Sequence, residues 1–273
     1  MTRTSALRSA ATRLAALAVA SLLLAGCGAD EGPQWGLLWS DEFDGPAGQL
    51  PDASNWGFDI GTDWGNAQLE YYTDRPENAS LDGNGNLVIT ARQEPYLGSQ
   101  YTSARMTTRG LFEQARGRFE ARMRLPSGQG LWPAFWMLGA DFPTVGWPAS
   151  GEIDIMEYRG QEPSIVFGSL HGPGYSGGNA ISRRFQLVQD RFDTGFHVFA
   201  VEWTDEYIDW FVDGQAYQRI TRSDVSGTWV FNKPFYIILN VAVGGTIVGP
   251  PGPNTTFPQT MLVDYVRVYG DVP

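Results

Sequence analysis

Three carboxyl side chains lie within six residues of one another, at Glu152, Asp154 and Glu157. Ile153 and Ile155 alternate with the first two acids, which is typical of a β-strand, because successive side chains of a strand point to opposite faces. Glu157 is out of phase with this alternation. One extra residue in the strand, a β-bulge, would return Glu157 to the acidic face, and bulges are frequent beside active sites. The segment is therefore predicted to form a rigid wall that carries three acids.

Carboxyl groups this close together cannot all ionise cheaply, so the pKa of at least one of them must rise. One ionised and one protonated carboxyl form the pair with which most glycoside hydrolases cleave an acetal. Taken alone, the three acids also fit a structural calcium site or a solvated strand face. Trp132, Trp136 and Trp147 lie upstream in Gly- and Pro-rich surroundings. Aromatic rings line ligand sites, which favours the enzymatic interpretation, although large rings are also common in protein cores.

The run from Glu152 to Glu157 resembles the E-x-D-x-x-E signature of glycoside hydrolase family 16, in its bulged, laminarinase-like branch. Four further segments resemble that family in the same order: residues 39–44, 86–92, 131–136 and 263–269. The resemblance covers roughly residues 38–269. It implies an all-β fold, a concanavalin A-like β-sandwich jelly roll with an open substrate cleft. It also implies an endo-β-1,3-glucanase that cleaves laminarin-like polysaccharides with retention of configuration.

The resemblance assigns roles to individual residues. Glu152 is the nucleophile, Glu157 the general acid/base, and Asp154 assists between them; the negative neighbours are expected to help keep Glu157 protonated. The residues expected to contact sugar are Trp132, Trp136, Trp147, Asn66, Arg105, His171, Asn240 and Gln259. Some of these polar residues have structural alternatives. A lone histidine such as His171 is often a satisfied structural group, and Asn240 could pin a loop instead, because a buried amide needs hydrogen bonds.

Other functions share parts of this pattern. A mixed-linkage β-1,3-1,4-glucanase is the nearest alternative, although the two residues between Asp154 and Glu157 favour the laminarinase-like branch. Galactan-cleaving relatives also have the bulge. An alternative of another class is an inactive glucan-binding lectin on the same fold, against which the presence of all three acids argues.

No cofactor is expected for catalysis. The resemblance implies a structural calcium ion far from the acids, bound by Glu42, the carbonyl of Gly85 and Asp264, and oxygen ligands suit that ion. One cysteine and two histidines do not provide a zinc ligand set.

The first 26 residues are expected to be a secretory signal. Three arginines precede an apolar stretch, residues 14–25, that is too short and wrongly flanked for a membrane span. The stretch ends in Leu-Ala-Gly-Cys, which resembles a bacterial lipobox with Cys27 as the lipidated residue; ordinary signal cleavage is the alternative. Residues 27–36 would then be a tether and 37–273 the catalytic domain. The protein is expected to be exported, and either lipid-anchored at the bacterial cell envelope or secreted.

The charge and composition of the chain indicate which partners it can bind and which fold it adopts. Removing the signal leaves 16 basic and 30 acidic residues, a formal net charge of −14. Such a charge argues against binding to nucleic acid or anionic membrane surfaces and favours a neutral β-glucan. The protein is expected to be a monomer. With 33 Gly and 17 Pro and no long helical period, the chain is expected to be all-β. With one cysteine it has no internal disulfide, so stability must come from the core.

Several segments have clear strand patterns. Residues 117–125 alternate between apolar and charged side chains, with Phe119, Ala121, Met123 and Leu125 on the apolar side. Residues 197–203 and 207–212 predict a hairpin. Trp203 and Trp210 fall in that hairpin and are expected to pack in the core or on a sheet face.

Overall fold

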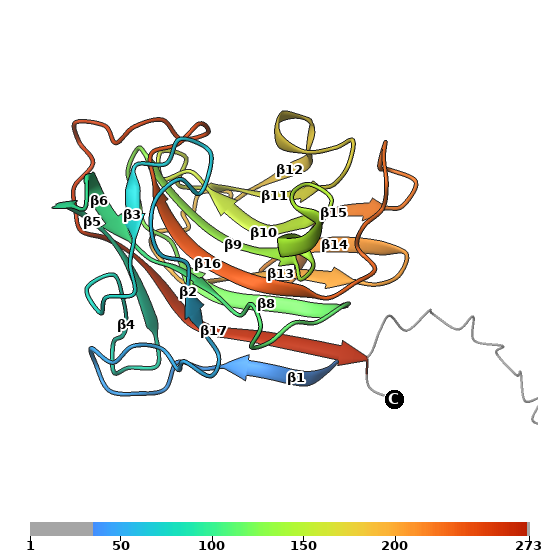
Figure 1. Cartoon of the computed structure of the whole chain (residues 1–273), viewed down its shortest axis with the longest axis horizontal. Helices are drawn as coiled ribbons and strands as arrows, with labels where there is room; N and C mark the ends of the chain where they lie inside the picture. The colour runs from blue at the N-terminus through green and yellow to red at the C-terminus, as the bar shows by residue number, and fades with distance from the viewer. Residues whose placement is uncertain (1–34, 272–273) are drawn as a thin grey trace, which may run out of the picture. The chain divides into compact units, whose positions relative to one another are not determined.

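The computed structural model describes residues 35–271, in which strands pair into two sheets stacked face to face (Figure 1). The larger sheet has the order β15-β14-β13-β8-β17-β5-β6-β3, with β1 on β17 and β4 on β5. Its strands are β1 (Trp35–Asp41), β3 (Glu70–Tyr72), β4 (Ala79–Leu81), β5 (Leu87–Tyr96), β6 (Ser99–Ser103), β8 (Gly117–Arg124), β13 (His197–Trp203), β14 (Tyr207–Val212), β15 (Gln215–Thr221) and β17 (Gln259–Asp271).

The second sheet carries the three acids and has the order β12-β11-β10-β9-β16-β7-β2. Its strands are β2 (Gly57–Phe58), β7 (Arg105–Thr107), β9 (Leu131–Gly139), β10 (Glu152–Tyr158), β11 (Ile165–His171), β12 (Ile181–Gln186) and β16 (Phe235–Val243). Strands β10, β9 and β16 lie side by side in the upper layer of Figure 1. The prediction of an all-β sandwich is confirmed.

The core lies between the two sheets, where the apolar sides of their strands meet. The four apolar residues predicted on one side of β8 are all buried. The predicted hairpin is β13 and β14, and its Trp203 and Trp210 are fully buried, as expected. Strand β16 is buried along its whole length, because one face packs in the core and the other lies under the cleft.

The first strand begins earlier than the sequence suggested. Trp35 pairs with Asp271 and Gly36 with Gly270 at the end of β17. The predicted tether of residues 27–36 is therefore two residues too long, because backbone pairing with a distant strand takes up its end. The predicted signal segment and Cys27 lie outside the described residues.

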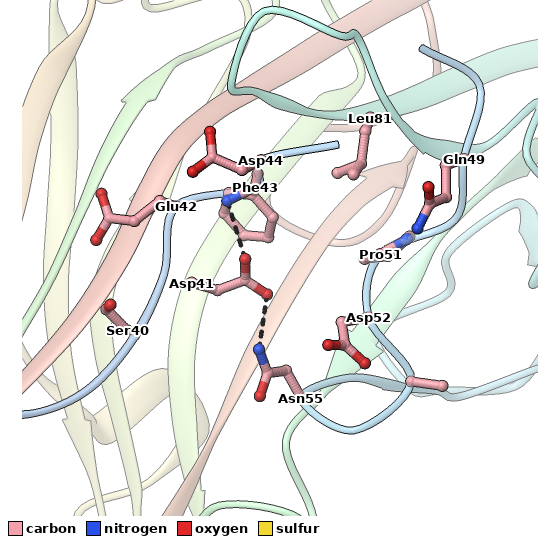
Figure 2. Close-up of a pocket in the computed structure, with 11 residues that line it drawn as sticks. Ser40, Asp41, Glu42, Phe43, Asp44, Gln49, Pro51, Asp52, Asn55 and Leu81 are labelled. Carbon is pink, nitrogen blue, oxygen red and sulfur yellow. Dashed lines mark hydrogen bonds between the residues drawn. The ribbon is translucent and has the colours of Figure 1, made fainter. Parts of the chain in front are cut away.

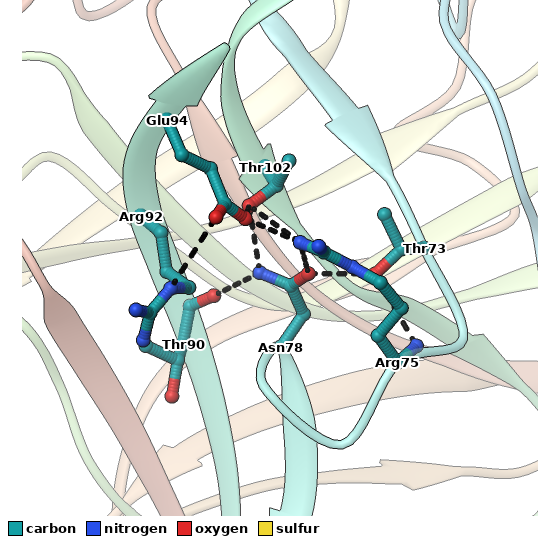
Figure 3. A network of polar contacts seen from close by, with 7 residues as sticks. All are labelled: Thr73, Arg75, Asn78, Thr90, Arg92, Glu94 and Thr102. Atoms are coloured by element: carbon teal, nitrogen blue, oxygen red, sulfur yellow. Dashed lines mark hydrogen bonds and ion pairs between the residues drawn. The ribbon is translucent and has the colours of Figure 1, made fainter. Parts of the chain in front are cut away.

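A polar network fastens the loop between β3 and β4 to the larger sheet (Figure 3). Arg75 forms an ion pair with Glu94 of β5, and Thr102 of β6 donates to the same carboxylate at 2.5 Å. Asn78 donates to Thr102 at 3.0 Å and accepts from Thr73 at 2.6 Å. The segment that directly follows β3 is therefore held rigidly against β5 and β6.

Helical structure is confined to α1 (Phe142–Val145) and the 3-10 turn η1 (Gly177–Asn179) within residues 35–271. Neither is long or apolar enough to cross a membrane. Both belong to loops at the edge of the acid-bearing sheet, where they frame the site.

Candidate active site

The predicted bulge is present in β10. Towards β9, Asp154 pairs with Trp136 and Met156 with the adjacent Phe135; towards β11, the register shifts between Asp154 and Glu157. The extra residue returns Glu157 to the side of Glu152 and Asp154, and all three acids line one cleft. A rigid strand thus carries the acids.

Two features behind β10 fix the bulge. Trp210 of the opposite sheet donates its indole N–H to the backbone carbonyl of Asp154 at 2.8 Å. Gly168 of β11 makes room for this ring, because a Cβ at that position would collide with Trp210 and with the Tyr217 hydroxyl. The carbonyl at the bulge thus receives a hydrogen bond from the core.

The cleft has a volume of about 870 Å³ and crosses the outer face of the acid-bearing sheet. Residues from β7, β9, β10, β11, β12 and β16 line it, together with the loop of residues 63–68 and the segment 246–247. The acids of β10 lie between two arms. One arm extends over β9, β16 and β7, and the other over β11 and β12. A polymer can therefore be bound on both sides of the acids.

Each of the two glutamates accepts a hydrogen bond from one indole N–H. Trp147 donates to Glu152 at 2.9 Å, and Trp132 donates to Glu157 at 3.2 Å. Ser169 of β11 lies 3.2 Å from the other oxygen of Glu157 and donates to it. Donors of this kind favour the ionised carboxylate and orient the side chain.

His171 lies beside the acids, at the end of β11. Its Nε2 is 3.1 Å from Oδ2 of Asp154 and 3.8 Å from Oε1 of Glu152, and its Nδ1 accepts the backbone N–H of Gly177 at 3.1 Å. A neutral imidazole that accepts at Nδ1 carries its proton on Nε2. His171 therefore directs a hydrogen-bond donor at the acids.

Glu152, Asp154 and His171 are also the one group of acidic and histidine side chains within residues 35–271 whose spacing would suit a metal ion. The hydrogen bond from Gly177 leaves Nε2 of His171 protonated, without a lone pair for a metal. The donor set therefore fits a hydrogen-bonded carboxyl cluster better than a metal centre.

Burial is the main cause of the raised pKa values in the cluster. Burial, followed by the charge of Asp154, raises the pKa of Glu152 to about 8. Burial and the charge of Glu157 raise the pKa of Asp154 well above its ordinary value, while a hydrogen bond with Glu152 opposes this. The pKa of Glu157 is raised by burial, against the effects of His171, Ser169 and Trp132.

The expected rise in carboxyl pKa is confirmed, but the reason expected for Glu157 is not. Desolvation of the site, rather than the charge of negative neighbours, is the main cause that raises the pKa of Glu157. Asp154 is only 3 % exposed, so the same desolvation favours the protonated form of its carboxyl.

An aromatic arm of the cleft is built around Arg105 of β7. Its guanidinium lies 4.7 Å from the ring centre of Trp64 and 4.8 Å from that of Trp136, and its Nε donates to Asp59 at 3.0 Å. Trp136 donates its indole N–H to Oδ1 of Asn240 at 2.8 Å. The guanidinium of Arg105 thus covers one face of the Trp136 ring, and the rest of the ring is open to the cleft.

Most of the predicted sugar-contacting residues line the cleft with the acids: Trp132, Trp136, Trp147, Asn66, Arg105, His171 and Asn240. Gln259 does not, so that prediction is wrong. Its amide contacts Ser127 and Thr256 at the start of β17 instead. Trp64 was missed, although it stands two residues before Asn66 in a turn rich in glycine and asparagine.

Of the predicted calcium ligands, Glu42 lines a second hollow, of about 520 Å³, at the end of β1. Figure 2 shows Glu42 there, with Asp41 turned toward Asn55. Arg267 binds both carboxylate oxygens of Glu42, at 2.9 and 2.7 Å, and Arg122 binds Asp264 at 2.6 Å. The carboxylates of Glu42 and Asp264 are thus both engaged by arginines. Calcium binding stays a prediction.

Two half-buried glutamates with a buried aspartate between them, lining a cleft in a β-sandwich, are the arrangement that glycoside hydrolases use. The model of the glycosyl hydrolases family 16 matches residues 62–267. The chain belongs to this family.

The chain is similar to glucanases both in sequence and in structure. A β-glucanase of Rhodothermus marinus is 47% identical over 88% of this chain and 87% of its own length. A glucan endo-1,3-β-glucosidase of Cryptopygus antarcticus is 39% identical over 90% of this chain and 96% of its own. The X-ray structure of an endo-β-1,3-glucanase from Pyrococcus furiosus superposes with a TM-score of 0.84 at 46% identity, covering 89% of this chain and 97% of that one. The jelly-roll prediction is thereby confirmed.

Proposed function

We propose that the protein is an endo-acting, retaining β-glucanase that hydrolyses β-1,3-glucosidic bonds in laminarin-like polysaccharides. The bulged strand carries the proposal, because it brings Glu152, Asp154 and Glu157 to one face of a cleft with an arm on either side. A chain bound across both arms is cut internally. The 1,3-linked substrate is supported by the names of the relatives.

In the first step Glu152 attacks the anomeric carbon and forms a covalent ester with it. The glycosidic C–O bond breaks, and Glu157 gives its proton to the leaving oxygen. Trp147 donates to Glu152 and favours its charged form, against burial, which raises the pKa of Glu152 to about 8. Burial raises the pKa of Glu157, which favours the protonated form that the leaving group needs.

In the second step the roles of the glutamates change. Glu157 is now ionised and takes a proton from a water molecule, whose oxygen attacks the anomeric carbon and releases Glu152. One water is consumed, and two inversions restore the starting configuration. Trp132 and Ser169 stabilise the ionised Glu157 during this interval, because both donate to its oxygens.

A reducing-sugar assay over laminarin, curdlan, lichenan and agarose tests this proposal. The highest turnover is expected on laminarin, with detectable cleavage of lichenan and none of agarose. Greater activity on lichenan would favour a mixed-linkage glucanase, and greater activity on agarose a galactan-cleaving enzyme. Binding to laminarin without any cleavage would indicate a lectin.

We further propose that the chain is exported and lipid-anchored through Cys27. The charged and apolar pattern of the first 26 residues and the lipobox-like sequence before Cys27 support this proposal. One acyl chain binds a membrane only marginally whereas several hold it firmly, so wild-type protein should fractionate with membranes. Cys27→Ser should release the protein or halt its processing, and wild-type protein found only as free enzyme in the medium would refute the anchor.

A further inference from the structure

Behind the aromatic arm of the cleft, a buried tyrosine makes polar contacts that the reaction itself does not use. Tyr72 ends β3 and is 0 % exposed. Its hydroxyl accepts a hydrogen bond from Nδ2 of Asn240 at 3.1 Å and donates to Oε1 of Gln68 at 3.3 Å. Tyr72 therefore contacts Asn240, the residue that accepts the indole N–H of Trp136.

The direction of this hydrogen-bond chain is fixed by chemistry. An indole N–H can only donate, so the carbonyl oxygen of Asn240 must face Trp136. The amide nitrogen then faces Tyr72, whose oxygen has to accept; its proton is left for Gln68 or for Glu70, both within hydrogen-bond reach. Each group polarises the next in the same sense, which strengthens the chain as a whole.

Tyr72 stands on a rigid base. The next residue, Thr73, donates its N–H to the carbonyl of Ser103 at 2.9 Å and its hydroxyl to Asn78 at 2.6 Å, within the network of Figure 3. On the preceding side, Glu70 accepts the N–H of Val243 at 2.6 Å. The hydroxyl of Tyr72 is thus a fixed point against which Asn240 is held.

Trp136 is restrained on two sides as a result. Arg105 covers one face of the ring, and Asn240 holds its N–H. Trp136 also lies directly opposite Asp154 in the register of β9 and β10, so its ring forms the cleft wall next to the acids. A rotation of the ring would change the space available to a sugar at this wall.

We propose that Tyr72 is a positioning residue for substrate binding, which acts through Asn240 to hold Trp136 in the orientation that receives the glycan. The proposal rests on the function proposed above. It assigns to a residue that does not line the cleft a part in substrate affinity, separate from the acids that perform the chemistry.

Tyr72→Phe removes the hydroxyl and keeps the ring. KM for the best glycan of the wild-type enzyme should rise about three- to tenfold, as expected for the loss of one buried hydrogen bond, with kcat within twofold. The matched control is Tyr158→Phe. Tyr158 is equally buried, and its hydroxyl has no hydrogen-bond partner among residues 35–271, so KM and kcat should stay at wild-type values.

A double-mutant cycle with Asn240→Ala separates positioning from a general structural effect. Asn240→Ala alone should also raise KM, and in that background Tyr72→Phe should raise it no further, because the connection to Trp136 is already broken. An unchanged KM in Tyr72→Phe, or the same rise with and without Asn240, would refute the positioning role. Failure of the wild-type enzyme on laminarin would refute the proposed function instead, and the cycle would then be measured on the glycan that is cleaved.

Discussion

Ser169→Ala should shift the alkaline limb of the pH–rate profile upward. The Ser169 hydroxyl lies on β11, directly opposite Asp154, and donates to Glu157 at 3.2 Å. Ser169 is also directed at the hydroxyl of Ser182, at 2.9 Å, so its single proton has two acceptors, of which the carboxylate is the stronger. This bond stabilises ionised Glu157 and opposes the rise in its pKa that burial causes.

The size of the shift follows from the strength of that bond. A hydrogen bond to a charged group contributes roughly 1.5 kcal/mol at the lower end of its range, which suits the long contact distance. Since one pKa unit corresponds to about 1.4 kcal/mol, removal of the hydroxyl should raise the pKa of Glu157 by about one unit. Glu157 must be protonated for the first step, so activity should persist to a pH about one unit higher.

The assay is kcat/KM for laminarin as a function of pH, because this ratio reports the ionisations of the free enzyme. Ser103→Ala is the matched control: Ser103 is also buried, its hydroxyl lacks a hydrogen-bond partner within the described chain, and it does not line the cleft. Its profile should coincide with that of the wild type. An alkaline limb that stays in place or moves downward in Ser169→Ala would refute the role given to this hydroxyl.

Three further predictions concern stereochemistry, stability and the histidines. Fresh product from a β-glucan should appear as the β-anomer in proton NMR spectra before mutarotation, and an α-anomer appearing first would mean that the two glutamates are too far apart for direct attack. Burial raises the pKa of Glu70 from 4.5 to about 7, so its stabilising protonated form is present below pH 4.5 and is lost as the pH rises through 7. Glu70→Gln should therefore gain roughly 3 kcal/mol in unfolding free energy relative to the wild type between pH 4.5 and pH 8, measured with urea; a difference independent of pH would contradict this. Nitrogen-15 NMR should distinguish the tautomers of the chain's two histidines. His171 should carry its proton on Nε2, and His197, whose Nδ1 lies 2.7 Å from Asp213, should carry one on Nδ1. A proton on Nδ1 of His171 would refute the tautomer inferred here.

Features that depend on local periodicity could be predicted from the sequence. The alternation of acids with Ile153 and Ile155, and the single residue by which Glu157 breaks it, predicted a bulged strand, and the register confirms it. Buried Trp203 and Trp210 followed from the alternation of their hairpin in the same way. These predictions hold because a strand places its side chains with period two whatever it packs against.

The partners of these side chains were decided by the tertiary structure. The sequence does not show that His171 points at the acids, that Arg105 lies between Trp64 and Trp136, or that Gln259 faces away from the cleft. Each of these outcomes depends on how distant strands register with one another.

Burial and long-range contact set the properties that matter for chemistry. Asn240 meets a tyrosine 168 residues away, and that contact determines which way its amide faces. The raised pKa of Glu157 comes from desolvation by the assembled cleft. The sequence by itself determined which groups would do the chemistry, because side-chain type and strand period are local. Only the fold decided their protonation and orientation, because both depend on neighbours that the two sheets bring together.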